Sequence, residues 1–384
     1  MARRNTIAVV SFWGDLGFNG EWRDCGRRLV ADGSQTVVEL KESRVLLDFC
    51  VVRLNHLRIL LFILSTFVMP LSTVSAKEPV AKKSVAKKFV AKGAWIIDPH
   101  THFKGAEQIE VEAKTNKRRA EDTLGQVVTP EEYRALAKRL GIQATLIVEA
   151  VDQEYPQFND WVIEQAKSDL VCGYIARGDL TSEKFVGNYQ RYKKSGYLNG
   201  YRFRFTELRG YLNNELARRN LNRLEQDDMV IDLLVEPPQA SDIVMLAKEY
   251  PKLKIVINHC FRARMEDGKI SDKWKEAVAT CAKYPNVYCK LSSIVNFADV
   301  EAFGQPAPKE LQHYLPVLDP CFEAFGEDRI IFATNWGVCS HFGTVDDVVR
   351  IATEFLKSKG DSALLKGMRE NAIRIYGIKK INLP

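Results

Sequence analysis

Short apolar runs alternate with longer amphipathic stretches from residue 93 to the end of the chain. The short runs are apolar at nearly every position, which is typical of strands buried on both faces of a parallel sheet. They predict eight strands, at residues 94–98, 144–149, 171–177, 198–204, 230–235, 253–257, 286–291 and 329–333.

The stretches between these runs have the spacing of helices. They predict helices at residues 130–140, 183–194, 217–225, 240–250, 273–284, 309–325 and 346–357. Thr129 followed by Pro130 is a common helix start. Eight strand-and-helix units favour a closed (β/α)8 TIM barrel of the α/β class over an open doubly wound sheet. No Gly-x-Gly-x-x-Gly follows the first strand, which argues against dinucleotide binding.

The chain before the barrel begins with two segments of different character. Residues 1–52 have no sustained period and stay unassigned; one interpretation is that they precede the natural start of translation. Residues 53–76 combine a basic flank, an apolar run and a small-residue ending, the pattern of a secretory signal peptide. The apolar run is shorter than the ~20 residues of a membrane span. We therefore expect an exported protein without a stable span after cleavage, with a buried helix or membrane anchor as the alternative.

Residues 77–92 repeat Val-Ala-Lys-Lys and are interpreted as a solvated linker before a barrel at 93–384. Of the formal net charge of +6, residues 1–76 carry +2, the linker +5 and the barrel −1. We expect no nucleic-acid partner, because phosphate binding needs cations clustered on a folded surface. A tail that binds anionic lipid or wall polymer is the alternative to a plain spacer.

The eight cysteines contain no Cys-x-x-Cys pair, which argues against metal knuckles and redox motifs. Cys172, Cys289 and Cys339 lie in or beside apolar runs, where free cysteines usually behave as small core residues. We expect no disulfide framework.

Polar side chains stand at nearly every predicted strand end, where a barrel of this kind carries its reactive groups. The candidates are His100, His102, Glu149, Arg202, Arg204, His259, Lys290, Asn335 and Trp336. His100 and His102 are spaced i, i+2 on an extended segment and share one face, so their imidazoles converge. Such a pair suits a divalent metal or the activation of a water, although a partnerless polar turn has the same sequence.

The other candidates have chemical roles of their own. His259 follows an apolar run and can exchange a proton near neutral pH. Arg202 and Arg204 share a face on which a guanidinium can hold a carboxylate or a developing oxyanion, or one of them neutralises a nearby acid. Lys290 places an ammonium in an otherwise apolar strand, which is costly without a task.

These residues resemble a known family through motifs in a specific order. The motifs are Ile97–Phe103, Gly200–Phe203, Ile231–Val235, Asn258-His259, Asn286–Ser292, Phe325–Trp336 and Glu370–Ala372. Over residues 95–378 the chain resembles the amidohydrolase-2 branch of the amidohydrolase superfamily, most of all its sugar-lactone lactonases, such as the fuconolactonases, and the 2-pyrone-4,6-dicarboxylate lactonases.

The resemblance implies a barrel that hydrolyses lactones or related esters and amides, with a bound divalent metal in some members. His100, His102, His259 and Arg202 match positions of the family pattern. Phe203 stands where the fuconolactonases usually have histidine, and Asn335 stands where the superfamily has its aspartate base. An amide cannot take the proton of the attacking water. Glu149, His259 or His102 then has to act as base, or the chemistry follows another route, or the site binds without turnover.

We therefore expect a hydrolase that opens a lactone of a sugar acid or small carboxylated ring. His100, His102, His259 and Asn335 form the catalytic set, and the substrate contacts are Arg202, Arg204, Lys290, Glu149 and Trp336. One zinc or manganese ion held by His100 and His102 and a metal-free site both stay open, since the missing carboxylate weakens metal binding. The alternative is a catalytically weakened relative that binds a sugar acid.

Overall fold

The computed structural model describes residues 95–114, 126–150, 158–205, 207–297, 306–379 and 381. The unassigned segment 1–52, the signal-like segment 53–76 and the linker 77–92 lie outside the described residues. Among the described helices, none combines the length and the apolar character that crossing a membrane requires.

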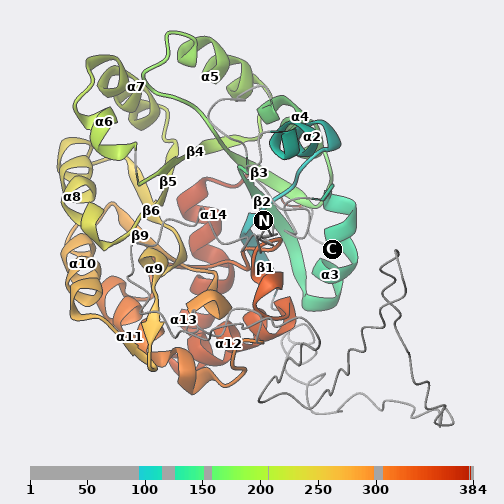
Figure 1. The fold of residues 1–384 in the computed structure, drawn as a ribbon, viewed down its shortest axis with the longest axis vertical. Helices are drawn as coiled ribbons and strands as arrows, with labels where there is room; N and C mark the ends of the chain where they lie inside the picture. The colour runs from blue at the N-terminus through green and yellow to red at the C-terminus, as the bar shows by residue number, and fades with distance from the viewer. Residues whose placement is uncertain are drawn as a thin grey trace, which may run out of the picture. The chain divides into compact units, whose positions relative to one another are not determined.

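Within the described ranges, eight parallel strands form one sheet in the order β1-β2-β3-β4-β5-β6-β9-β10. The strands are β1 (Ile96–Thr101), β2 (Ile142–Val148), β3 (Val171–Ala176), β4 (Leu198–Arg204), β5 (Val230–Leu234), β6 (Lys254–Ile257), β9 (Val287–Leu291) and β10 (Ile330–Phe332). A parallel bridge between Thr101 and Trp336 brings β1 beside the segment after β10. The predicted TIM barrel is thus confirmed, and its ring is nearly closed (Figure 1).

Helices surround the strands on the outside of the ring (Figure 1). They are α2 (Ala106–Lys114), α3 (Pro130–Leu140), α4 (Phe158–Gln165), α5 (Phe185–Lys194), α6 (Leu208–Leu212), α7 (Glu215–Gln226), α8 (Ala240–Glu249), α10 (Asp272–Ala282), α11 (Leu311–Phe325), α12 (Val345–Ser358) and α13 (Asp361–Leu365). A short hairpin of β7 (Met265–Glu266) and β8 (Lys269–Ile270) follows β6. All seven predicted helices are present within a few residues of their expected bounds.

Helix α3 shows how local sequence sets these bounds. The Thr129 backbone N–H and hydroxyl both donate to the Glu132 carboxylate, and Pro130 is the first helical residue. Pro suits this position because its missing N–H would have no partner there. Gly141 ends the helix with φ of 74°, a left-handed conformation that glycine adopts without strain.

Two buried cores lie on either side of the barrel wall. The larger lies between the strands and the outer helices, and the smaller fills the barrel interior with side chains such as Ile97, Val230 and Ile331. Helix α14 (Asn371–Tyr376) packs its apolar side chains onto this inner core. Because Asn199, at the start of β4, donates to the carbonyl of Tyr376, α14 covers the end of the barrel where strands begin.

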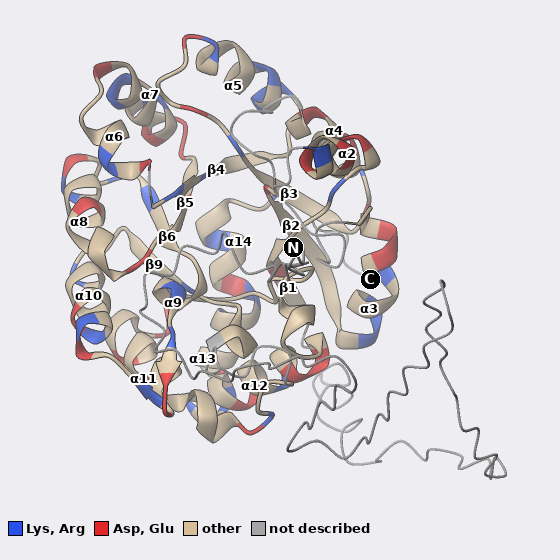
Figure 2. Cartoon of the chain, viewed as in Figure 1, with Lys and Arg blue, Asp and Glu red and all other residues tan. Residues whose placement is uncertain are grey.

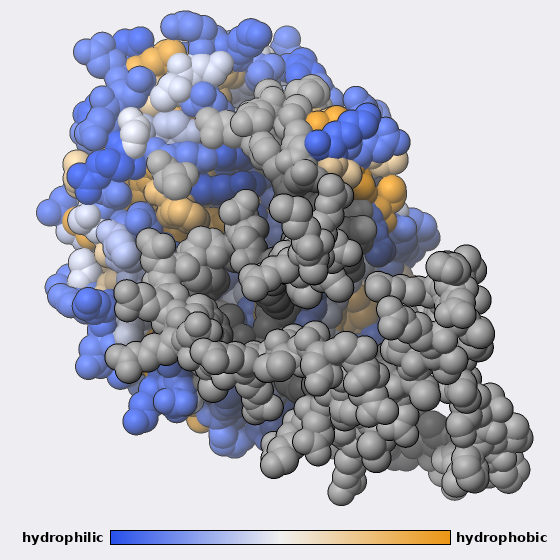
Figure 3. Space-filling view, viewed as in Figure 1, coloured by the Kyte–Doolittle hydropathy of each residue, from blue (hydrophilic) through white to orange (hydrophobic). Residues whose placement is uncertain are grey.

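The surface of the barrel carries both signs of charge. Lysine and arginine alternate with aspartate and glutamate along the outer helices in this view (Figure 2). Hydrophilic side chains dominate the uncovered part of the same face, with small hydrophobic areas between them (Figure 3). This pattern agrees with the nearly neutral composition of residues 93–384.

Candidate functional site

The histidine pair is placed by a bulge in β1. Asp98 and Thr101 are three residues apart, but they face Thr145 and Ile147, which are two apart. The extra residue re-aims the side chains that follow it, and Pro99 is tolerated there because a bulge leaves an N–H unpaired. The rings of His100 and His102 meet edge to face, with centroids 4.9 Å apart. The two imidazoles thus lie together, as their spacing predicted.

His259 joins this pair from a strained turn after β6. Residues 259–262, assigned as α9 (His259–Arg262), all have positive φ, from 47° to 62°. Left-handed conformations cost roughly 1–2 kcal/mol per non-glycine residue. The turn brings the ring of His259 to 4.6 Å from that of His100, and its Nδ1 lies 2.8 Å from the Ser292 hydroxyl.

Strain recurs at the ends of the next two strands. Ser293 after β9 has φ of 56°, and Asn335 after β10 has φ of 58°. The amide of Asn335 is bonded to the hydroxyl of Ser293 and lies 3.2 Å from His102 Nε2. Residues in such conformations concentrate at functional sites, where the surrounding structure holds them.

Hydrogen bonds hold the ring of His102 at both nitrogens. Its Nδ1 lies 2.9 Å from the carbonyl oxygen of Val148, and its Nε2 lies 3.2 Å from the amide oxygen of Asn335. The NH2 group of Asn335 donates to the hydroxyl of Ser293. Asn335 therefore orients the ring of His102 without acting as a base.

Lys290 organises the opposite side of His100. Its ammonium is fully buried and donates to the Pro99 carbonyl at 3.1 Å, to His100 Nδ1 at 3.2 Å and to Asp232 at 2.7 Å. Asp232 also accepts the Tyr376 hydroxyl from α14. Burial lowers the pKa of His100 well below its usual value, and the charge of Lys290 lowers it further. A neutral His100 that accepts at Nδ1 carries its proton on Nε2 and is a hydrogen-bond donor there.

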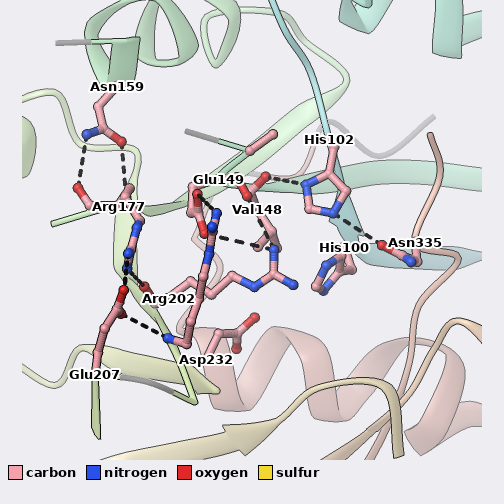
Figure 4. A network of polar contacts seen from close by, with 12 residues as sticks. His100, His102, Val148, Glu149, Asn159, Arg177, Arg202, Glu207, Asp232 and Asn335 are labelled. Carbon is pink, nitrogen blue, oxygen red and sulfur yellow. Dashed lines mark hydrogen bonds and ion pairs between the residues drawn. The ribbon is translucent and has the colours of Figure 1, made fainter. Parts of the chain in front are cut away.

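A buried carboxylate and two arginines form the third part of the site (Figure 4). Arg202 and Arg204 lie 3.9 and 3.6 Å from the oxygens of Glu149 at the end of β2. Burial raises the pKa of Glu149, although Arg204 and Arg202 oppose this shift. Burial likewise lowers the pKa of Arg202 to about 10. The guanidinium of Arg202 points toward the ring of His100 (Figure 4), and its charge lowers the pKa of His100 and of His259.

Arg177 and Trp336 also lie at strand ends, but their side chains contact other parts of the barrel wall. Arg177 pairs with Glu207 and donates to the carbonyl of Arg202, while Asn159 holds the backbone of Arg177. Trp336 packs its ring on Tyr133, with centroids 4.6 Å apart, on the helix side of the barrel wall.

Asp98 explains how the barrel closes between β1 and β10. Its carboxylate accepts from the Thr334 backbone N–H at 2.9 Å, from the Thr334 hydroxyl, and from the Tyr133 hydroxyl of α3 at 2.7 Å. A side chain thus links two strands that are joined beyond it by the single bridge at Thr101. The aspartate next to the histidines is thereby committed to structure.

Several polar atoms at this end of the barrel are buried and find no hydrogen-bond partner among the described residues. They are His100 Nε2, both carboxylate oxygens of Glu149, Arg202 Nε and both amide atoms of Asn258. They come from β1 and β4 and from the residues that follow β2 and β6. Buried polar groups are almost always bonded, so such a group of exceptions marks a place where a ligand or water supplies the missing bonds.

The structure brings eight of the nine candidates from the sequence together at this end of the barrel, all except Trp336, and it adds partners that the sequence did not indicate. Lys290 is held by Asp232, which in turn accepts the hydroxyl of Tyr376. His259 is held by Ser292, and Asn335 is held by Ser293. Asp232 is one acidic residue within an apolar run, which is only a weak signal of a functional role. The two serines resemble ordinary turn residues.

The expectation of one divalent metal can be tested against the donor atoms. Among the described side chains, three donors from His, Cys, Asp or Glu come within 4.8 Å of one another only at Cys260, Cys289 and Cys321. At the histidines, Asn335 supplies no charge, and the Lys290 bond leaves a proton on His100 Nε2. A metal needs a bare nitrogen at that position. The histidine site in this arrangement does not fit a bound metal.

Comparison with known proteins agrees with the fold. Residues 97–378 match the amidohydrolase family. An L-fucono-1,5-lactonase of Burkholderia multivorans is 25% identical over 281 residues, covering 71% of this chain and 92% of that enzyme.

Two solved structures share the fold. A zinc-bound amidohydrolase from Burkholderia multivorans aligns with a TM-score of 0.65 and 22% identity, over 74% of this chain and 100% of that one. A probable 2-pyrone-4,6-dicarboxylic acid hydrolase from Acinetobacter baumannii, with citric acid bound, aligns with a TM-score of 0.58 and 16% identity, over 73% and 99%. Since the family match spans most of the chain, this protein belongs to the amidohydrolase family and is a hydrolase.

Proposed function

We propose that this hydrolase opens a lactone of a sugar acid or of a small carboxylated ring by attack of an activated water. The observation that carries the proposal is the group of buried, unpartnered polar atoms beside three converging histidines, of which His100 and His259 have pKa values lowered by burial. Lactones present a carbonyl, ring oxygen and hydroxyl or carboxylate groups that such atoms can bind. The lactonase among the relatives supports this substrate class.

The carbonyl would be polarised by His100 and Arg202. Neutral His100 presents an N–H at Nε2 that has no protein acceptor, and Arg202 Nε is likewise unpartnered among the described residues. Donors already in place where negative charge develops stabilise the transition state without reorganisation. Lys290 uses its three N–H groups within the protein, so in this proposal it positions His100 and does not contact substrate.

His259 would take the proton in place of the missing aspartate. Burial lowers its pKa well below the usual value, so the ring is neutral at pH 7 and has a free lone pair that can accept a proton. Its Nδ1 is bonded to Ser292, which leaves Nε2 for the water. The water oxygen bonds to the carbonyl carbon as its proton passes to His259. The ring C–O bond then breaks, and His259 returns the proton to the leaving oxygen.

Glu149 and the two arginines would hold the rest of the substrate. Both oxygens of Glu149 lack hydrogen bonds and can accept from sugar hydroxyls, and Arg204, one-third exposed, can bind a carboxylate. No step uses a metal, because the donor set does not fit one. The export of the protein is part of the proposal and is supported only by the pattern of residues 53–76.

The test is acid release from a panel of aldonolactones by the full chain, with chelator and separately with added zinc or manganese. We expect activity that persists in chelator and falls at least 100-fold in His259→Asn, since a general base contributes about 10²–10⁴-fold. His313→Gln, on helix α11, is the matched control and should retain activity.

Two outcomes would contradict this proposal. Activity that requires added metal would mean that the histidines rearrange around an ion. Activity found only in Asn335→Asp would support the second candidate, a relative that binds a sugar acid without turnover, which the neutral side chain at Asn335 favours.

A further inference from the structure

Three cysteines lie together behind the turn that carries His259. Cys260 belongs to this turn, Cys289 to β9 and Cys321 to α11. Each is at most 1% exposed, and their sulfur atoms all lie within 4.8 Å of one another. They occupy the layer between the barrel wall and the outer helices, outside the proposed lactone site.

The three thiols interact as a group. Their sulfur atoms are close enough to contact one ion, and the layer around them is apolar. A thiolate in an apolar layer is costly unless a positive charge compensates it. The thiolate is also the form of cysteine that binds metals.

The geometry suits three sulfurs around one ion. Three sulfurs placed trigonally at about 2.3 Å from an ion, the usual zinc–sulfur distance, are about 4 Å apart. The three sulfur atoms in this structure all lie within 4.8 Å of one another, which is compatible with that separation. Small relaxations of the side chains can therefore bring all three sulfurs to bonding distance.

The donor set distinguishes between possible ions. No fourth His, Cys, Asp or Glu donor joins the group among the described residues, whereas structural zinc is almost always four-coordinate. Soft thiolate ligands select cuprous copper as well as zinc. We propose that Cys260, Cys289 and Cys321 form a three-sulfur site for a soft, thiophilic ion, with cuprous copper as the ion that fits it.

Binding would displace the thiol protons and tie three elements together. Cys260 follows His259 directly, and Cys289 precedes Lys290 in the chain. The Cys260 thiol also lies 3.7 Å from the carbonyl of Lys290. An ion here would hold the strained turn against β9 and α11 and would stabilise the folded chain in proportion to its affinity.

The test uses the full chain with Cys25→Ser and Cys50→Ser in every variant, so that these two thiols do not bind copper. Reduced protein is refolded with cuprous copper under anaerobic conditions and then challenged with bicinchoninate. We expect one retained ion per chain, coordinated only by sulfur in X-ray absorption, and a higher melting temperature than without copper. Cys321→Ala should lose at least 90% of the retained copper, whereas Cys172→Ala, a buried thiol in β3, should retain it.

Loss of all copper to the chelator from the parent chain would overturn the proposal, as would equal retention by Cys321→Ala and Cys172→Ala. If Cys321→Ala does not fold without copper, as judged by circular dichroism, Cys289→Ala replaces it in the same comparison. Neither result depends on lactone hydrolysis, so failure of the copper site is distinct from failure of the proposed activity.

Discussion

Replacing Lys290 by methionine tests whether its buried ion pair organises the barrel mouth. Lys290 and Asp232 are both 0% exposed and lie 2.7 Å apart. Removing one partner of such a pair costs roughly 3–5 kcal/mol, because the other charge stays buried without compensation. Tyr376 still donates to Asp232, which places the expected loss near the lower limit, about 3 kcal/mol. The Pro99 carbonyl also loses a donor, at a cost of about 1 kcal/mol.

The chain provides a matched control for this variant. Lys254 and Asp228 are also 2.7 Å apart, but their side chains are 18% and 72% exposed. Lys254→Met should therefore cost less than about 1 kcal/mol. The free energy of unfolding is measured by urea titration followed by circular dichroism for both variants and for Lys290→Met combined with Asp232→Asn.

The combined variant separates charge from packing. Without the carboxylate, it should recover at least about 2 kcal/mol of the loss, the difference between an uncompensated buried charge and a neutral hydrogen-bonded side chain. Its hydrolytic activity should stay low, because His100 has lost the donor that fixes its tautomer. Equal losses in Lys290→Met and Lys254→Met, or no recovery in the combined variant, would refute the reasoning.

Three further outcomes are expected. Gly200→Ala should lower the free energy of unfolding by several kcal/mol, because the added Cβ would lie 2.0 Å from the backbone oxygen of Val230 in β5. Gly187→Ala in helix α5 meets nothing within 4 Å and should raise the free energy of unfolding by about 0.5–1 kcal/mol. Thermal unfolding compares the two variants. Tyr133→Phe should cost about 1–3 kcal/mol in a urea titration, because Asp98 loses a buried donor. Burial holds the pKa of His259 below its unfolded value of 6.5, so its contribution to stability is complete above pH 6.5 and lost as pH falls toward the folded pKa. His259→Asn should lower the slope of unfolding free energy against pH by up to about 1.4 kcal/mol per unit in that window, and an unchanged slope would contradict a neutral His259.

Some of the site followed from the sequence because it depends on local spacing. The predicted strands end at the residues that the structure brings to the barrel mouth. The ring centroids of His100 and His102, spaced i, i+2, are 4.9 Å apart. The short helices α2, α4, α6, α13 and α14 were not predicted. Their few turns give too little periodicity for a pattern to stand out.

The tautomers and roles of the same residues could not be read from the chain. Lys290 looked like a substrate contact, but all three of its N–H groups are bonded within the protein. The neighbours that decide this come from distant parts of the sequence, since Asp232 lies 58 residues away and Pro99 lies 191 away. Asp98, two residues before His100, accepts the backbone N–H of His100 and bonds across the barrel wall to Thr334.

The sequence by itself determined the barrel, the strand ends and the list of candidate residues, because burial on both faces and strand spacing leave a direct record in residue order. Only the tertiary structure decided which polar groups meet. It showed the bulge that re-aims His100, the left-handed turn that delivers His259 and the gathering of three thiols behind it. These features depend on contacts between segments far apart in the chain, and residue order does not record such distances.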